Sequence, residues 1–310
     1  MKKIFIDGKA GTTGLRIEER LSQRDDVKII ALPDELRKDI EARRKIINEA
    51  DIVFLCLPDD AAREAVSLIE NESVTVIDAS TAHRTNAAWD YGFPELSLKS
   101  REKIADSKRV ANPGCHASGF ISLVRPLVED GILSPDVLLT CHSVTGYSGG
   151  GKKMIAQYEA AGDDLLLSSP RQYGISQSHK HLPEMAKVSG IENAPVFSPI
   201  VSNFYSGMEV TVPLFASQLN KGKTIEDIKS VYRELYCGPV VKYAEAGDEG
   251  GFLSATALSG KDSMEISVYG NEERIILVSR YDNLGKGASG AAVQCFNIMH
   301  GIDETLSLEL

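Results

Sequence analysis

The stretch Lys3-Ile4-Phe5-Ile6-Asp7-Gly8-Lys9-Ala10-Gly11-Thr12-Thr13-Gly14 decides the fold of the first part of the chain. Its apolar beginning is typical of a buried strand, and the glycines that follow at once permit a tight turn. The next residues, 13–24, have the pattern of a helix. A strand, a glycine-rich loop and a helix in this order indicate a site for a dinucleotide pyrophosphate, because the backbone approaches the ligand closely and the helix N-terminus offers N–H groups.

The spacing of the loop is G-x-x-G-x-x-G rather than the commoner G-x-G-x-x-G, and a glycine turn without a ligand is the alternative interpretation. The strand–loop–helix context favours the ligand. We therefore predict cofactor contacts from Gly8, Gly11, Thr12, Thr13 and Gly14.

The choice between NAD and NADP stays open at this point. Asp34 follows the second predicted strand, where an acidic residue would bind the ribose 2′-hydroxyl of NAD. Arg16, Arg37 and Lys38 are nearby candidates for binding the 2′-phosphate of NADP. The spacing of these residues does not decide between the two cofactors.

Outward from the first loop, short apolar runs alternate with helical patterns. We predict buried strands over residues 3–7, 27–32, 51–57 and 74–79, and helices over 13–24, 35–49 and 59–70. Runs with little polar alternation are typical of parallel strands that are covered on both faces. The order predicts a Rossmann-like, doubly wound parallel sheet with right-handed crossovers.

The middle of the chain has a different pattern, with β-rich runs and few helices between them. These runs cover residues 137–144, 196–202, 209–215, 265–268 and 274–281. They predict an α+β domain with a mixed or antiparallel sheet. A capping-box pattern at Thr224 predicts a helix over 224–236, and a final helix is expected over 288–300.

Composition excludes several classes of protein. The chain has 310 residues, a net charge of −10 and a sequence pI near 5.2, which do not suit a nucleic-acid-binding protein. The apolar start is too short for a signal peptide, and no stretch is long enough to span a bilayer. The five widely spaced cysteines are expected to be reduced, and we expect a cytoplasmic protein.

Cys115 is the strongest candidate for a nucleophile. It lies in Asn112-Pro113-Gly114-Cys115-His116-Ala117, directly before an apolar helical stretch over residues 118–128. A helix N-terminus stabilises a thiolate, which is the form that attacks an acyl carbon. The alternative is a buried structural cysteine, an interpretation that suits Cys56, Cys141 and Cys295 better.

A second group of chemically active side chains lies in Ser178-His179-Lys180-His181-Leu182-Pro183-Glu184. A histidine transfers protons at neutral pH, and a nearby carboxylate can fix its tautomer. His179, His181 and Glu184 are therefore candidates for acid–base catalysis. Zinc is the competing interpretation, but no further Cys or His cluster completes a set of four ligands, so we predict no metal.

Two further segments are candidates for binding anions. Arg84 closes Ile77-Asp78-Ala79-Ser80-Thr81-Ala82-His83-Arg84 at the carboxyl edge of the predicted sheet, where it could hold a phosphate or carboxylate by two hydrogen bonds. Gly149-Gly150-Gly151-Lys152 follows a predicted strand and opens a helix, so it is either an anion-binding loop or a hinge.

Several motifs in one order make the chain resemble the N-acetyl-γ-glutamyl-phosphate reductase family, in its shorter subtype and within the aspartate-semialdehyde dehydrogenase superfamily. The motifs are residues 8–14, 78–84, 91–96, 112–115, 179–184 and 283–290, and the resemblance spans nearly the whole chain. Its most specific parts are Asn112-Pro113-Gly114-Cys115 and Tyr91-Gly92-Phe93-Pro94-Glu95-Leu96. His116 and Thr81-Ala82-His83 depart from the longer relatives and put the details of substrate contact in question.

The resemblance implies an NADPH-dependent reduction of an acyl phosphate in arginine biosynthesis. Cys115 would attack the γ-acyl phosphate and form a thioester, which takes a hydride and collapses to the semialdehyde. His181 would carry the proton, with His179 beside it and Glu184 orienting it. The other implied contacts are Arg84, Asn112, Gly149 and Gly150 for the substrate, and Asn283 and Gly285 for the cofactor.

The same resemblance implies the division of the chain and its assembly. An NADP-binding domain would comprise residues 1–114 and 284–310, and a catalytic and oligomerisation domain would comprise 115–283. A homo-oligomer, either a dimer or a tetramer, is expected, with a small acyl phosphate as the binding partner and neither nucleic acid nor membrane.

Other functions are compatible with the same motifs. Related enzymes act on aminoadipyl or aspartyl phosphate. A non-catalytic NADP-binding sensor would use the glycine loop and leave Cys115 idle. A cysteine hydrolase or acyltransferase would leave the dinucleotide loop without a purpose.

Overall fold

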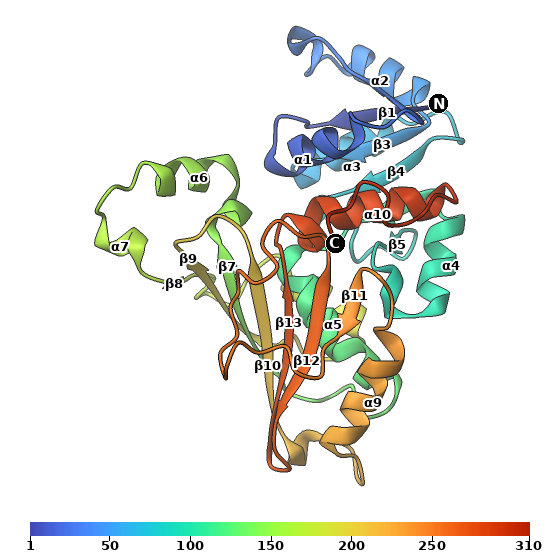
Figure 1. Cartoon of the computed structure of the whole chain (residues 1–310). Coiled ribbons are helices and arrows are strands. Elements are labelled where there is room, and N and C mark those ends of the chain that lie inside the picture. Colours follow the sequence, from blue (N-terminus) through green and yellow to red (C-terminus); the bar gives the residue numbers. More distant parts are fainter. The chain divides into compact units, whose positions relative to one another are not determined.

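The computed structural model describes all 310 residues and divides into two compact units (Figure 1). The first unit comprises Met1–Pro94, Lys99–Pro113 and Ala288–Leu308, and the second comprises Glu95–Leu98, Gly114–Gly287 and Glu309–Leu310. The functional domains that we predict, with boundaries after residues 114 and 283, stay a prediction.

A parallel sheet forms the centre of the first unit, and the predicted doubly wound architecture is confirmed. The strands follow the order β2-β1-β3-β4-β6-β5, and every neighbouring pair is parallel. They are β1 (Lys2–Asp7), β2 (Val27–Ile30), β3 (Ile52–Leu55), β4 (Thr75–Asp78), β5 (Asp90–Tyr91) and β6 (Arg109–Ala111).

Apolar side chains of the strands feed two separate cores, one on each face of this sheet. In β1, Ile4 and Ile6 belong to the core with α1 (Thr12–Leu21) and α10 (Gly290–Met299), whereas Phe5 belongs to the core with α2 (Ile40–Glu49) and α3 (Asp59–Ser67). Successive side chains of a strand point to opposite faces, so a continuous apolar run is buried throughout. The fourth helix of this region is α4 (Leu98–Asp106).

The predicted helix over residues 35–49 begins later than expected. Asp34–Leu36 form only a short 3-10 turn after Pro33, and α2 starts at Ile40. Asp39 determines this start, because its carboxylate accepts a hydrogen bond from the Ala42 N–H at 2.7 Å. Arg37 is the residue that directly follows this turn.

A mixed sheet forms the second unit, as predicted. Its order is β11-β12-β13-β10-β7-β9-β8, with parallel pairs β11–β12 and β7–β9 and antiparallel pairs elsewhere. The strands are β7 (Thr140–Gly146), β8 (Arg171–Gln172), β9 (Val196–Ser202), β10 (Met208–Phe215), β11 (Val241–Tyr243), β12 (Met264–Gly270) and β13 (Arg274–Tyr281).

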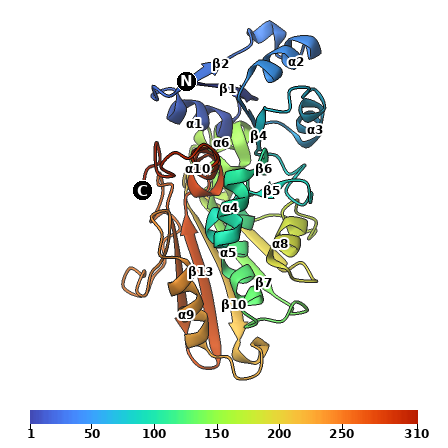
Figure 2. The same ribbon diagram turned by 90° about the vertical axis from the view of Figure 1, so that its right-hand side faces the viewer.

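Helix α5 (Cys115–Glu129) is the central helix of this unit, and it packs on β10 and β13. Figure 2 shows α8 (Leu182–Ser189) and α9 (Ile225–Leu235) on either side of it. The approach to β10 is close, because a Cβ at Gly119 would lie 2.6 Å from the Tyr281 hydroxyl and from Val210. The predicted capping box at Thr224 is confirmed at the start of α9.

Two short helices, α6 (Gly151–Glu159) and α7 (Leu165–Ser168), lie beside β8 and β9 in Figure 1. They form a small apolar core, in which Tyr158 and Leu167 pack with Val201 of β9. None of the helices in the structure combines the length and the apolar character that crossing a membrane would require.

The first prediction concerns Gly8, which has a φ of +86°. A Cβ at this position would lie 2.3 Å from the Cys56 carbonyl oxygen. Gly8→Ala should therefore lower the free energy of unfolding by about 2 kcal/mol or more. Gly11→Ala is the matched control, because its φ is −74° and its Cβ would meet only ordinary contacts, the nearest at 3.4 Å.

Urea unfolding followed by tryptophan fluorescence measures this difference, because the single tryptophan, Trp89, packs against a core of the first unit. The control should lose less than about 1 kcal/mol. Equal stability of the Gly8 and Gly11 variants would show that the left-handed turn does not constrain this loop.

Candidate active site

The glycine-rich loop of the first unit leads from β1 into α1. A Cβ at Gly14 would lie 2.8 Å from the Gly8 carbonyl oxygen, so this glycine lets the loop pack tightly on the helix. The first turn of α1 holds no acidic residue, and Thr12 Oγ1 is buried without a hydrogen-bond partner. A helix N-terminus without negative charge and with an unused hydroxyl fits a phosphate ligand.

The loop after β4 is fixed by the buried carboxylate of Asp78. This carboxylate accepts hydrogen bonds from the Ser80 N–H at 2.9 Å and the Ser80 hydroxyl at 2.7 Å, and it contacts His83 Nδ1 at 2.6 Å. The His83 ring stacks on Trp89 with centroids 4.1 Å apart. The loop that ends at Arg84 is therefore rigid.

Arg84 connects this loop to the one that follows β6. Its Nε donates to the Asn112 carbonyl oxygen and its Nη2 to the Ala79 carbonyl oxygen, both at 2.9 Å. The side chain is 9% exposed. Through these two bonds Arg84 holds the loop after β4 against the loop after β6. Its contact with substrate phosphate stays a prediction.

Of the two polar atoms in the Asn112 side chain, one forms a hydrogen bond and the other does not. Its Nδ2 donates to the Ala288 carbonyl oxygen at 3.0 Å, while its Oδ1 is buried without a hydrogen-bond partner. A buried acceptor that is left unpaired is costly, so it is a candidate for binding a donor group.

Cys115 is the first residue of α5 and is half-buried. The Gly114 N–H just before it donates to Glu184 Oε1 at 2.8 Å. The hydroxyl of Tyr281 donates to the Cys115 carbonyl oxygen at 2.5 Å and accepts from the Gly119 N–H at 3.0 Å. The main chain on both sides of the thiol is therefore held by buried side chains.

The histidines of the predicted motif lie beside the residue that follows Cys115. The His116 ring centroid is 5.7 Å from those of His179 and His181, which are themselves 4.8 Å apart. The structure thus brings Cys115, both motif histidines and Glu184 together within the second unit.

The tautomer of His179 follows from its surroundings. Burial, and then the positive charge of Lys180, lowers the pKa of His179, so the ring is neutral at neutral pH. Its Nδ1 accepts a hydrogen bond from the His181 main-chain N–H at 3.2 Å. The proton of the neutral ring therefore resides on Nε2, which can donate a hydrogen bond.

His116 is held between two hydroxyl groups. Its Nδ1 lies 2.7 Å from Ser143 Oγ, and its Nε2 lies 2.6 Å from the Tyr173 hydroxyl. Burial, and then the charge of Cys115, raises the pKa of Tyr173, so its hydroxyl keeps its proton. Tyr173 and Ser143 are site residues that the sequence analysis missed, since neither belongs to a recognisable motif.

Asn283 and the glycine loop after β7 also lie side by side. Asn283 Oδ1 accepts from the Gly207 N–H, and its Nδ2 donates to Ser148 Oγ, both at 2.9 Å. A Cβ at Gly149 would lie 3.3 Å from Asn283 Nδ2, whereas one at Gly150 would collide with Met154. The ligand contacts of Asn283, Gly149 and Gly150 stay a prediction. The hydrogen bonds of Asn283 hold Ser148 of this loop to Gly207.

Gly285 packs closely on the main chain of Lys261, because a Cβ at Gly285 would lie 2.1 Å from the Lys261 carbonyl oxygen. It begins a π-helical turn, Gly285–Ser289. Lys286 in this turn is 1% exposed and forms a 2.7 Å ion pair with Glu95. The pair links the Tyr91–Leu96 motif to the Asn283–Gly290 motif, and a Cβ at Gly287 would lie 3.2 Å from Cys115 Cβ.

Two other thiols, those of Cys56 and Cys141, are poor candidates for a nucleophile. Burial, and then Asp78, raises the pKa of Cys56 to about 12, and burial also raises the pKa of Cys141. Thiols held in the protonated form are poor nucleophiles. No group of three or more His, Cys, Asp or Glu side chains is arranged to hold a metal ion.

Comparison with known proteins assigns the family. A family model described as "Semialdehyde dehydrogenase, dimerisation domain" matches residues 115–283, and "Semialdehyde dehydrogenase, NAD binding domain" matches residues 25–107. N-acetyl-gamma-glutamyl-phosphate reductase 2 of Nostoc sp. is 45% identical over 318 residues, which cover 99% of each chain. The chain belongs to the N-acetyl-γ-glutamyl-phosphate reductase family.

A second relative and the solved structures agree with this membership. The N-acetyl-gamma-glutamyl-phosphate reductase of Brucella ovis is 45% identical over 306 residues, covering 96% of this chain and 99% of the relative. Aspartate semialdehyde dehydrogenases of Francisella tularensis (TM-score 0.72, 97% and 100% covered) and Vibrio cholerae (TM-score 0.71, 97% and 98% covered) are each 15% identical and share the fold. The predicted reductase family and superfamily are confirmed.

Glu184 offers a test of how this reductase site is held. Glu184→Ala leaves the buried Gly114 N–H without its acceptor, so the free energy of unfolding should fall by about 1–3 kcal/mol. Glu184→Gln keeps an acceptor oxygen and should lose less than half as much. Urea unfolding followed by circular dichroism measures both variants, and an Ala variant as stable as the Gln variant would contradict the role of this bond.

His116 should make the second unit sensitive to acid. Burial, and then His179 and Lys180, lowers the pKa of His116 to about 3. The unfolded chain, with a histidine pKa near 6.5, therefore binds more protons between these values, and stability falls as the pH drops below 6.5. Between pH 7 and pH 5 this residue should account for a loss of about 2 kcal/mol.

The comparison needs His116→Gln and a matched control, His142→Gln, whose side chain is exposed on β7. Urea unfolding at the two pH values should show a smaller acid loss for the His116 variant and the wild-type loss for the control. A His116 variant with the wild-type pH dependence would mean that His116 has the same pKa in the folded and unfolded states.

Proposed function

We propose that this protein reduces N-acetyl-γ-glutamyl phosphate to N-acetylglutamate semialdehyde and phosphate with NADPH, in arginine biosynthesis. The observation that carries the proposal is Cys115 at the N-terminus of α5 with a histidine cluster beside it, in a chain 45% identical over its whole length to named reductases of this substrate. A thiol and histidines suit acyl transfer, and a dinucleotide-binding loop suits the reduction.

The loop residues of the first unit are the ones that would hold the cofactor. Gly8 and Gly14 allow the close turn, and Gly11, Thr12 and Thr13 place N–H groups and hydroxyls at the start of α1. When bound, NADPH supplies the hydride that turns the enzyme-bound thioester into a thiohemiacetal.

Cys115 performs the covalent steps. Its thiolate attacks the γ-carbonyl carbon, a carbon–sulfur bond forms, and the carbon–oxygen bond to phosphate breaks, so that phosphate leaves with the bonding electrons. After reduction, the thiohemiacetal loses the thiolate and a proton and releases the aldehyde. The partial positive charge at the α5 N-terminus stabilises the thiolate both as nucleophile and as leaving group.

His179 and His181 are proposed to have different roles in the reaction. His179 carries its proton on Nε2 and is suited to donating a hydrogen bond to the carbonyl oxygen of the substrate, where negative charge develops. His181 is then the residue left to move the proton, since His116 is bonded at both ring nitrogens. Glu184 fixes the main chain beside Cys115, and Tyr173 is held in place by His116.

Arg84 and Asn112 are proposed to contact the phosphate or carboxylate groups of the substrate, and Gly149 and Gly150 to line its path. Asn283 and Gly285 are proposed to act near the nicotinamide. The support for Asn112 is its unpaired buried oxygen, and for the others it is their place in the family motifs. A homo-oligomeric state and a cytoplasmic location stay predictions.

The test uses the reverse reaction. N-acetylglutamate semialdehyde, NADP and phosphate should give phosphate-dependent formation of NADPH, measured by its absorbance. Cys115→Ser should reduce this rate by about 1,000-fold or more, because an alcohol of unshifted acidity is a poor nucleophile and leaving group. Cys237→Ser is the control, because that thiol is exposed and is expected to leave the rate unchanged.

Other outcomes identify the competing functions. Substantial turnover by Cys115→Ser would overturn the covalent mechanism. Faster turnover of aspartate or aminoadipate semialdehyde derivatives would change the substrate and keep the chemistry. Tight NADP binding without turnover of any aldehyde would indicate a sensor, and acyl-phosphate hydrolysis without nicotinamide would indicate a hydrolase.

A further inference from the structure

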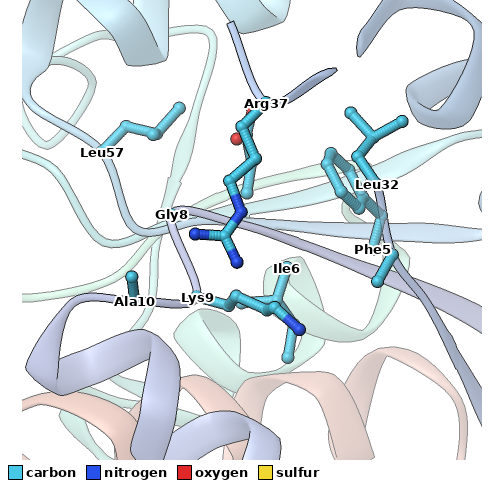
Figure 3. Close-up of a pocket in the computed structure, with 10 residues that line it drawn as sticks. Phe5, Ile6, Gly8, Lys9, Ala10, Leu32, Arg37 and Leu57 are labelled. Carbon is cyan, nitrogen blue, oxygen red and sulfur yellow. The ribbon is translucent and has the colours of Figure 1, made fainter. Parts of the chain in front are cut away.

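A cavity of about 160 Å³ lies in the first unit beyond the carboxyl ends of β1 and β2. Apolar side chains, among them Phe5, Leu32 and Leu57, form part of its lining, together with Gly8 of the glycine loop. Figure 3 shows the Arg37 guanidinium extending into this space toward Gly8 and Lys9. The cavity therefore joins an apolar surface, a phosphate-binding loop and two cationic side chains.

The acidic residues nearby either lie outside the lining of the cavity or are bound by another residue. Asp34, which followed the second predicted strand, is not part of the lining, and its side chain is 81% exposed. Asp7 does belong to the lining, but its carboxylate is bound by Arg43 at 3.0 Å and is 10% exposed. The residues that directly follow β2, Ala31-Leu32, carry no carboxylate for a ribose 2′-hydroxyl.

Both cations are held loosely enough to bind a ligand. Arg37 pairs with Asp34 at 2.5 Å and is 40% exposed, and Lys9 pairs with Glu18 at 3.5 Å and is 32% exposed. Exposed ion pairs of this kind contribute little to stability, so exchanging a carboxylate for a phosphate costs little. A guanidinium also matches the geometry of phosphate oxygens with two parallel hydrogen bonds.

We propose that Arg37, with Lys9 beside it, binds the 2′-phosphate of NADP(H) and thereby selects this cofactor over NAD(H). The assignment rests on the proposed function for the class of cofactor. Arg37 directly follows the 3-10 turn Asp34–Leu36 and lines the cavity, whereas Lys38, its neighbour, does not. The alternative role for Arg37 is stacking on the adenine ring. This contact would not distinguish a cofactor with the 2′-phosphate from one without it.

The experiment measures binding rather than turnover. Isothermal titration calorimetry on the full-length protein compares 2′,5′-ADP with 5′-AMP, two probes that differ only in the 2′-phosphate. Arg37→Met should weaken the binding of 2′,5′-ADP by about 10- to 100-fold, as expected for losing hydrogen bonds to a charged group, and leave the affinity for 5′-AMP within about twofold. Lys9→Met should weaken 2′,5′-ADP by about three- to tenfold.

The controls are Lys38→Met, which should change neither affinity, and Arg37→Lys, which should keep part of the discrimination because the charge remains. Thermal unfolding checks that the exposed substitutions leave the fold intact. Equal weakening of both probes by Arg37→Met would replace the proposal with adenine stacking, and unchanged affinity for both would overturn it.

A failure of this assignment can be distinguished from a failure of the proposed function. Wild-type protein that discriminates between the probes through Arg37 but produces no NADPH with any aldehyde would overturn the proposed reaction and support this assignment. Wild-type protein that produces NADPH while Arg37→Met still prefers 2′,5′-ADP to the same degree would overturn this assignment alone.

Discussion

The hydrogen bond from the Gly114 N–H to the buried carboxylate of Glu184 is the contact on which the site in the second unit depends. Glu184 lies in the first turn of α8, and Gly114 is the residue before α5, so one carboxylate lies near the beginnings of both helices. A negative charge is favourable near both of these N-termini. Because His179 and His181 directly precede α8, fixing that helix against α5 also fixes the histidines near Cys115.

Much of the polar chemistry in the recognised motifs serves to hold loops in place. Arg84 bonds to two carbonyl oxygens, and Asn283 bonds to Gly207 and Ser148. Catalysis of acyl transfer depends on atoms being held in reactive geometry, so hydrogen bonds that position the backbone contribute to rate in addition to any contact with the substrate. The same logic explains the buried Lys286–Glu95 pair, whose desolvation is offset only while both partners are present.

The sequence predicted those features that depend on local patterns. The apolar runs identified the parallel strands, because residues such as Ile4, Phe5 and Ile6 serve cores on both faces of the sheet. It could not predict that Ser143 and Tyr173, 27 and 57 residues away from His116, would meet its two ring nitrogens. Nor could spacing separate Arg37 from Lys38, since the direction of the side chain depends on a turn that Pro33 and Asp39 define.

Three neighbouring imidazoles raise the question of where positive charge resides in this site. His116 and His179 are kept neutral by burial and by their cationic neighbours, so neither provides an imidazolium to pair with the Cys115 thiolate. The N–H groups at the start of α5, which do not titrate, are a source of stabilisation for a thiolate at this position. The proposed nucleophile would keep this support as the pH changes, and the neutral His179 ring would remain available to donate a hydrogen bond.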